Sequence, residues 1–139
     1  MRNILVDAGP LIALFDKSDQ YHLKSLRFMK GFHGYLSTTW PVISEVSHML
    51  DFSVKAQLSF LEWINRGGLQ VVDLSDQHLF RMTALTEKFS DVPMDLADAS
   101  LVAIAETLKI LEIATIDSDF YVYRDVRNNW GDLDPKSQD

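Results

Sequence analysis

The stretch ILVDAGPLIAL, residues 4–14, decides the fold class that we expect for this chain of 139 residues. Ile4-Leu5-Val6 is a short apolar run with β-branched residues, which predicts a buried strand. Asp7 follows the strand at once. Gly9-Pro10 then marks a turn into a helix, because proline is tolerated in the first helical turn. The stretch therefore predicts a strand, a carboxylate at its end and a helix.

The rest of the chain repeats this alternation of short β-rich runs and helical segments. We predict further strands at 35–38, 69–72 and 113–116, with a candidate fifth at 121–123, and helices at about 19–32, 39–50, 53–65, 75–89 and 93–108. Such alternation is typical of an α/β fold with a mostly parallel sheet. We expect helices to cover both faces of that sheet.

Composition is consistent with one ordinary globular domain, which we place at residues 1–130, followed by a polar tail at 131–139. Hydrophobic residues make up 47% of the chain. There is no cysteine, which excludes a disulfide framework, a thiolate zinc site and a cysteine nucleophile. No apolar run reaches the ~20 residues that span a bilayer, and the start does not resemble a signal peptide. We therefore expect a cytoplasmic protein.

The net charge of −7 argues against a simple nucleic-acid-binding protein, which would carry a basic surface. Two interpretations remain open. The surplus of acidic residues can be solvated surface charge, or several carboxylates can gather to hold divalent cations. Bound metal would reverse the sign of the charge at such a site.

The positions of the acidic residues favour a gathered site. Asp7 follows the first predicted strand, while Asp117 and Asp119 follow the fourth. In parallel α/β sheets, function concentrates at the carboxyl ends of the strands. Glu45 and Asp98 lie in the first turns of two predicted helices, among apolar neighbours that imply partial burial. These five residues are the candidate metal ligands.

Each acidic residue also has an ordinary structural interpretation. Acidic residues near helix N-termini are stabilised by the helix dipole, and this accounts for Asp95 as well as a functional role does. Asp119 can simply form a turn, since aspartate bonds readily to its own backbone. Asp7 is harder to explain in this way, because it stands between two apolar stretches and a carboxylate there needs a partner.

Clustered oxygen ligands have a clear chemical use. Mg²⁺ and Mn²⁺ prefer oxygen ligands, and Mg²⁺ is usually held by one or two carboxylates together with waters and substrate phosphates. A bound metal lowers the pKa of its water, and the resulting hydroxide attacks phosphorus. Carboxylates delivered by several segments are therefore typical of a metal-dependent phosphodiester hydrolase.

Taken together, these stretches resemble a PIN domain and, within that superfamily, the VapC toxins of bacterial and archaeal toxin–antitoxin pairs. Four motifs carry the resemblance in order, over nearly the whole chain to about Tyr123. They are residues 4–14 with Asp7, residues 38–46 with Glu45, residues 93–102 with Asp98, and residues 114–120 with Asp117 as the main acid and Asp119 as an accessory.

The resemblance implies a three-layer α/β/α sandwich with a central, mostly parallel sheet of four to five strands. It implies an endoribonuclease that uses Mg²⁺ or Mn²⁺, with Asp7, Glu45, Asp98 and Asp117 as catalytic residues. It also implies a homodimer and a cognate antitoxin. One departure concerns the first motif, where many relatives place Ser or Thr soon after the first acid. This chain has Ala8-Gly9, and Ser44, Thr115 or Ser118 are candidates to supply the hydroxyl.

Two other functions compete with the ribonuclease. A phosphatase or phosphotransferase can use an aspartate after the first strand as its nucleophile. It needs a second acid close behind and a lysine near the later acids, yet position 9 is glycine and no lysine lies between Lys88 and Lys109. The other alternative is a PIN-like module that binds RNA or protein without cutting. Retention of all four acids argues against that module.

Overall fold

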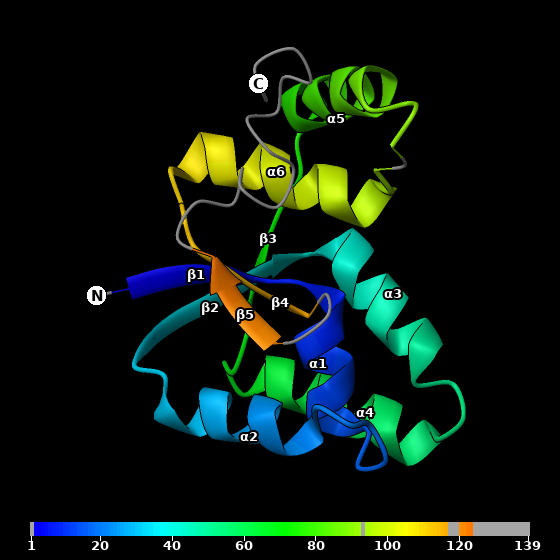
Figure 1. The fold of residues 1–139 in the computed structure, drawn as a ribbon, viewed down its shortest axis with the longest axis vertical. Coiled ribbons are helices and arrows are strands. Elements are labelled where there is room, and N and C mark those ends of the chain that lie inside the picture. The colour runs from blue at the N-terminus through cyan, green and yellow to red at the C-terminus, as the bar shows by residue number, and fades with distance from the viewer. Residues whose placement is uncertain (1, 93, 117–119, 124–139) are drawn as a thin grey trace.

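The computed structural model describes residues 2–92, 94–116 and 120–123, and shows a five-stranded sheet between two layers of helices (Figure 1). The strand order is β3-β2-β1-β4-β5. β1 to β4 are parallel, and β5 pairs antiparallel with β4 at the edge. The strands are β1 (Arg2–Val6), β2 (Gly34–Thr39), β3 (Gln70–Val72), β4 (Ile113–Ile116) and β5 (Phe120–Tyr123). The expected α/β/α sandwich is therefore confirmed.

β1 occupies the centre of the sheet, with parallel neighbours on both sides. Leu5 stands opposite Ser37 of β2 and Ile113 of β4. Ile4, Leu5 and Val6 are completely buried. A strand whose two faces are both covered by helices reads as a continuous apolar run, which is why this segment lacks polar alternation.

The helices divide between the two faces of the sheet. α1 (Ala8–Phe15), α2 (His22–Gly31) and α4 (Val54–Asn65) pack together on one face. α5 (Asp76–Lys88) and α6 (Leu96–Leu108) pair on the other. α3 (Trp40–Met49) continues directly from β2 and contacts both α1 and α6. It thus joins the two layers at the edge where β1 and β2 end.

The start of α6 differs from the sequence prediction. We expected the helix from residue 93, but it begins at Leu96, with Asp95 as its N-cap. The Asp95 side chain accepts a hydrogen bond from the Asp98 backbone N–H, and the Asp98 side chain accepts one from the Asp95 backbone N–H. This reciprocal capping satisfies two backbone donors at the new start, so the helix has a defined beginning there.

The buried face of α4 is not the one that apolar spacing alone would give. Leu58, Leu61 and Ile64 stand three residues apart in the sequence, yet Leu58 and Leu61 are exposed. Phe60 is the fully buried residue instead, and its ring lies 5.5 Å from that of Phe15 in α1. A large aromatic ring fills the space between two helices better than a leucine does, and its register therefore sets the face.

Within the described residues, none of the helices combines the length and apolar content that a bilayer crossing needs. The polar tail that we expected at 131–139 lies outside the residues that the structure describes.

Replacing Phe60 by alanine should lower the free energy of unfolding by about 3–5 kcal/mol, since it removes a buried aromatic ring and leaves a cavity. Urea denaturation measures this change. Phe80→Ala is the matched control, because Phe80 in α5 is 81% exposed and its loss should change the value by only about 0.5 kcal/mol. Equal effects of the two substitutions would contradict the packing described above.

Candidate active site

Asp7 is held where the central strand passes into α1. It is the N-cap of α1, and its Oδ1 accepts a hydrogen bond of 2.8 Å from the Ala8 backbone N–H. Its Oδ2 accepts one of 3.1 Å from the Thr115 hydroxyl on β4. Its own backbone N–H donates to the Ala114 carbonyl at 3.0 Å. Strand pairing and capping together therefore fix this carboxylate at the carboxyl edge of the sheet.

Thr115 is also the best candidate to replace the hydroxyl that many relatives have just after the first acid, where this chain has Ala8-Gly9. Of the three candidates, Thr115 contacts Asp7, whereas Ser44 is exposed on α3 and Ser118 lies outside the described residues. Gly9 has a separate reason to be small. A Cβ at this position would lie 3.1 Å from the Cβ of Ile116, so glycine lets the first turn of α1 approach β4 closely.

Glu45 comes to the same edge on α3. This helix follows β2 without a loop, with Pro41 at its start. Val42, Ile43 and Val46 bury its inner face, which leaves Glu45 half-buried between that face and solvent. Thr39 is the N-cap residue of α3, but its side chain makes no capping hydrogen bond.

Asp98 comes from the opposite layer, in the first turn of α6. It is half-buried, while Asp95, which caps the same helix, is exposed. Asp95 therefore has an ordinary structural role at the helix N-terminus, as a cap and not, as expected, within the first turn. Asp95 nevertheless also acts on the site, because its negative charge contributes to raising the pKa values of Asp7, Glu45 and Asp98.

These carboxylates are placed where ionisation is unfavourable. Burial, followed by the charges of Asp7 and Asp95, raises the pKa of Asp98 to about 7. Burial is also the main cause that raises the pKa of Asp7 and that of Glu45. In the described part of the chain, the ion pairs to arginine lie elsewhere, at Glu62, Glu106 and Glu112. Four interacting carboxylates with no ion pair to lysine or arginine in the described residues are an arrangement that a bound cation would stabilise.

The donor set fits Mg²⁺ or Mn²⁺ in chemical type, since Asp7, Glu45 and Asp98 all offer carboxylate oxygens. The described residues alone do not complete a metal site. Among the described residues, no three acidic or histidine side chains lie close enough together to hold one ion. Asp117 and Asp119 lie outside those residues, so the structure does not test their predicted roles. The described part of the site therefore consists of Asp7, Glu45 and Asp98, with Asp95 and Thr115 beside them.

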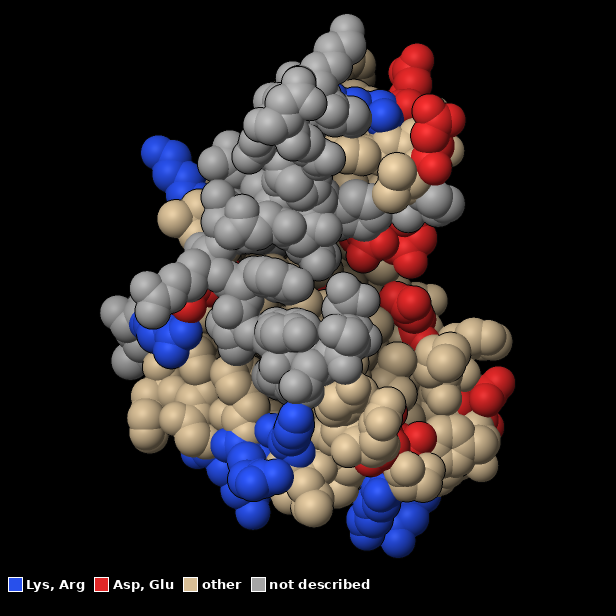
Figure 2. All heavy atoms as spheres, viewed as in Figure 1, with Lys and Arg blue, Asp and Glu red and all other residues tan. Residues whose placement is uncertain are grey.

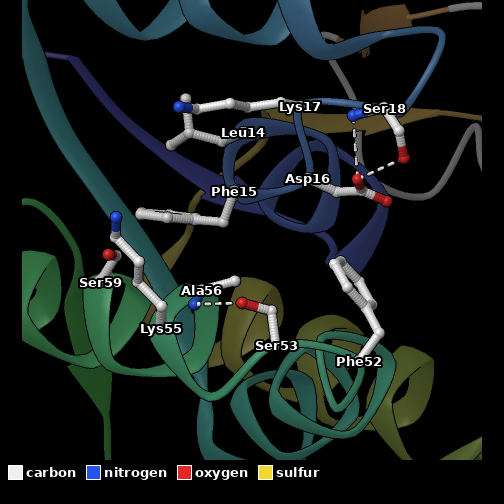
Figure 3. A pocket seen from close by; sticks show the side chains of 10 residues that line it. All are labelled: Leu14, Phe15, Asp16, Lys17, Ser18, Phe52, Ser53, Lys55, Ala56 and Ser59. Atoms are coloured by element: carbon white, nitrogen blue, oxygen red, sulfur yellow. Dashed lines mark hydrogen bonds between the residues drawn. The ribbon is translucent and has the colours of Figure 1, made fainter.

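A separate hollow of about 490 Å³ lies between the end of α1 and the beginning of α4 (Figure 3). Phe15 and Phe52 give it an apolar wall. Its Asp16 carboxylate accepts hydrogen bonds from Ser18, and its Ser53 hydroxyl caps α4. None of the site carboxylates lines it, and its polar groups already serve local structure. We therefore do not assign the chemistry to this hollow.

The charges divide over the molecular surface. In Figure 2, acidic side chains lie along the right-hand side, near α3 and the beginning of α6, whereas lysine and arginine gather mainly over the α2–α4 layer below. The net charge of −7 is thus not spread evenly on this face. An acidic edge next to a more basic layer favours the interpretation of a cation site over that of uniform solvated charge.

The sequence model of the PIN domain family matches residues 4–126. The chain belongs to the PIN domain family. This match covers the central strand, both helical layers and the acidic edge, and it confirms the resemblance drawn from the four motifs. No curated protein sequence matches the chain.

Solved structures share this PIN fold. VapC20 of Mycobacterium tuberculosis, described as a toxin that cleaves the Sarcin–Ricin loop, superposes with a TM-score of 0.76 at 17% identity, covering 84% of this chain and 91% of that one. A chain of a toxin–antitoxin complex from Klebsiella pneumoniae gives 0.62 at 17% identity, covering 83% and 87%. VapBC2 of Rickettsia felis, bound to promoter DNA, gives 0.59 at 15% identity, covering 83% and 88%.

The raised pKa of Asp98 predicts a pH dependence of stability. Because the folded state holds its proton up to about pH 7 and the unfolded chain releases it near pH 4, the folded state binds more protons between these values. In metal-free buffer, the contribution of Asp98 to stability should therefore fall as pH rises from about 4 to about 7. Urea denaturation of the wild type and Asp98→Asn across this range measures it.

The asparagine side chain cannot titrate, so the Asp98→Asn variant should lack this pH dependence. Its free energy of unfolding should therefore rise relative to that of the wild type as pH increases. A constant difference in unfolding free energy between the two proteins would contradict the raised pKa.

Proposed function

We propose that this PIN domain protein is a divalent-metal-dependent endoribonuclease, and that Asp7, Glu45, Asp98 and Asp117 carry the chemistry. The observation that supports this most strongly is the convergence of Asp7, Glu45 and Asp98 from three elements, without a cationic side chain beside them in the described residues. Such a group gains little from a purely structural role, since the charge of Asp7 raises the pKa values of both Glu45 and Asp98.

Each residue has a proposed task. Asp7 is the most firmly held carboxylate, and we assign it the central place in binding Mg²⁺ or Mn²⁺. Asp98 and Glu45 approach from the two helices that face each other across this edge, and would complete the binding with Asp117 and Asp119. Thr115 orients Asp7 through its hydroxyl, as the Ala8 backbone N–H does at the other oxygen, and each oxygen keeps a second lone pair for the ion. A bound divalent ion would supply an activated water and stabilise charge on the phosphodiester.

RNA is the proposed substrate. VapC20 is described as cleaving the Sarcin–Ricin loop, and this chain shares its fold over 84% of its length. The acidic edge would repel an RNA phosphate in the absence of metal, because its carboxylates face an anionic substrate. Activity should therefore depend strictly on divalent ions.

We also propose that the protein is the toxin of a type II toxin–antitoxin pair, and that it forms a homodimer. Two of the similar structures are toxin–antitoxin assemblies. A free surface suited to the homodimer lies on α3 and α4, where a hollow of about 590 Å³ is lined in part by Trp40 and Leu61. Trp40 is 56% exposed, which is unusual for a large aromatic side chain and typical of interfaces. The adjacent reading frame is the first place to look for the antitoxin.

Purified protein should cleave a total cellular RNA pool in Mg²⁺ or Mn²⁺, and EDTA should abolish the cleavage. Asp7→Asn and Asp98→Asn should each lower the rate by about 100-fold or more, since each removes a charged ligand oxygen. Asp76→Asn is the matched control, because Asp76 is an exposed acid in the first turn of α5.

Cleavage that survives in both site variants would point to a contaminating nuclease and overturn the assignment. An absence of cleavage with metal still bound would favour the alternative of a PIN-like module that binds RNA or protein.

Light scattering coupled to size-exclusion chromatography tests the dimer. The wild type should elute as a dimer and Trp40→Glu as a monomer, because a charge at the centre of an apolar interface is costly to bury. Phe80→Glu, which alters an exposed aromatic residue in α5, should remain dimeric. A monomeric wild type would contradict the homodimer, and a dimeric Trp40→Glu variant would contradict the choice of surface.

A further inference from the structure

A buried hydroxyl pair joins the two helices that carry Glu45 and Asp98. The Thr39 Oγ1 lies 2.6 Å from the Ser100 Oγ, and both residues are completely buried. Thr39 stands at the junction of β2 and α3, and Ser100 in the second turn of α6. The two residues are 61 positions apart in the sequence, so the contact belongs to the tertiary structure.

The direction of the hydrogen bonds follows from the number of hydrogens. The Ser100 hydroxyl donates to the Ala97 carbonyl at 2.7 Å, which uses its single hydrogen. Thr39 must therefore donate to Ser100. The result is a chain of two bonds from the start of α3 to the first turn of α6, the turn that also holds Asp98 and its partner Asp95.

Thr39 makes this contact in place of its ordinary local role. Threonine at an N-cap usually accepts a hydrogen bond from a backbone N–H of its own helix, and Thr39 does not. The neighbouring caps Asp7, Ser53, Ser75 and Asp95 all do. Positions where a side chain makes a long-range contact instead of its usual local hydrogen bond are often found at functional sites. Here the long-range contact connects the helix of one site carboxylate with the helix of another.

We infer that the Thr39–Ser100 hydroxyl pair is a positioning contact that sets the separation of Glu45 and Asp98. The inference rests on the proposed metal site. Neither hydroxyl is a ligand in it, because both are buried in the interior beneath the carboxylates' helices. Their task is to hold α3 and α6 together, so that Glu45 and Asp98 both stay near Asp7, whose charge acts on each of them. Contacts of this supporting kind typically change metal affinity by ~10–100-fold when they are lost.

Thr39→Val is the sharpest variant. Valine keeps the β-branched shape, and Ser100 keeps its bond to Ala97, so no buried hydroxyl is left without a partner. No capping bond is lost either. Thr39→Ser is the conservative variant that retains the hydroxyl. Ser25→Ala is the matched control, because the Ser25 hydroxyl is equally buried and bonds the Pro10 carbonyl, within the α1–α2 layer on the other face.

The measurement is Mn²⁺ binding by isothermal titration calorimetry, at a temperature where circular dichroism shows every variant folded. Thr39→Val should weaken Mn²⁺ binding by about tenfold or more. Thr39→Ser and Ser25→Ala should bind like the wild type. Ser100→Ala should also weaken binding, and it serves as the second variant if Thr39→Val does not fold. RNA cleavage by Thr39→Val should recover at higher Mn²⁺.

The other outcomes are separable. If the wild type and Thr39→Val bind Mn²⁺ equally well, the positioning role is overturned and the proposed function stays intact. Equal weakening in Ser25→Ala would also overturn it, since the effect would then be one of general stability. A wild type that neither binds Mn²⁺ nor cleaves RNA would contradict the proposed function, and the positioning role with it.

Discussion

The parallel pairing of β1 with β2 on one side and β4 on the other is the constraint on which the site depends. It brings the ends of these strands to one edge, and each end leads to a polar group of the site. β1 ends at Asp7, β2 passes directly into the helix of Glu45, and β4 contributes Thr115. α6 then approaches the same edge from the other layer and adds Asp98. A slip of one residue in β1 would turn Asp7 away from Thr115 and break the arrangement.

Electrostatics at this edge oppose stability and favour ligand binding. Burial and mutual repulsion raise the pKa values of three carboxylates, so part of the folding free energy is spent on holding charges close together. Burial of the apolar core offsets this cost. Ile4, Val42 and Leu101, which stand near the three acids in the sequence, are all buried. Metal binding to such a site would stabilise the folded state, since the unfolded chain offers no comparable group. This gain in stability on binding is the electrostatic basis of the proposed cation site.

Much of this could be predicted from the sequence. The apolar run before Asp7 predicted a buried strand, and the rule that function gathers at the carboxyl ends of strands indicated the edge at which Asp7 lies. The place of Asp95 near the beginning of a helix could be predicted, but not its electrostatic effect on three other acids, which arises only from packing α6 against β2 and α3. The Thr39–Ser100 contact could not be predicted, because a threonine before a helix normally caps that helix. The buried face of α4 could not be predicted for a similar reason: the sequence offers two apolar registers, and the fit of Phe60 against Phe15 decides between them.

The most direct test of the central claim is a crystal structure of the protein grown in Mn²⁺, with anomalous scattering used to locate the ion. The account predicts a strong anomalous peak at the carboxyl edge of the sheet, within coordination distance of Asp7 and Asp98. Loss of that peak in Asp7→Asn crystals would confirm the ligand. A peak elsewhere on the molecule, or no peak at this edge in saturating Mn²⁺, would contradict the claim that these carboxylates form a metal site.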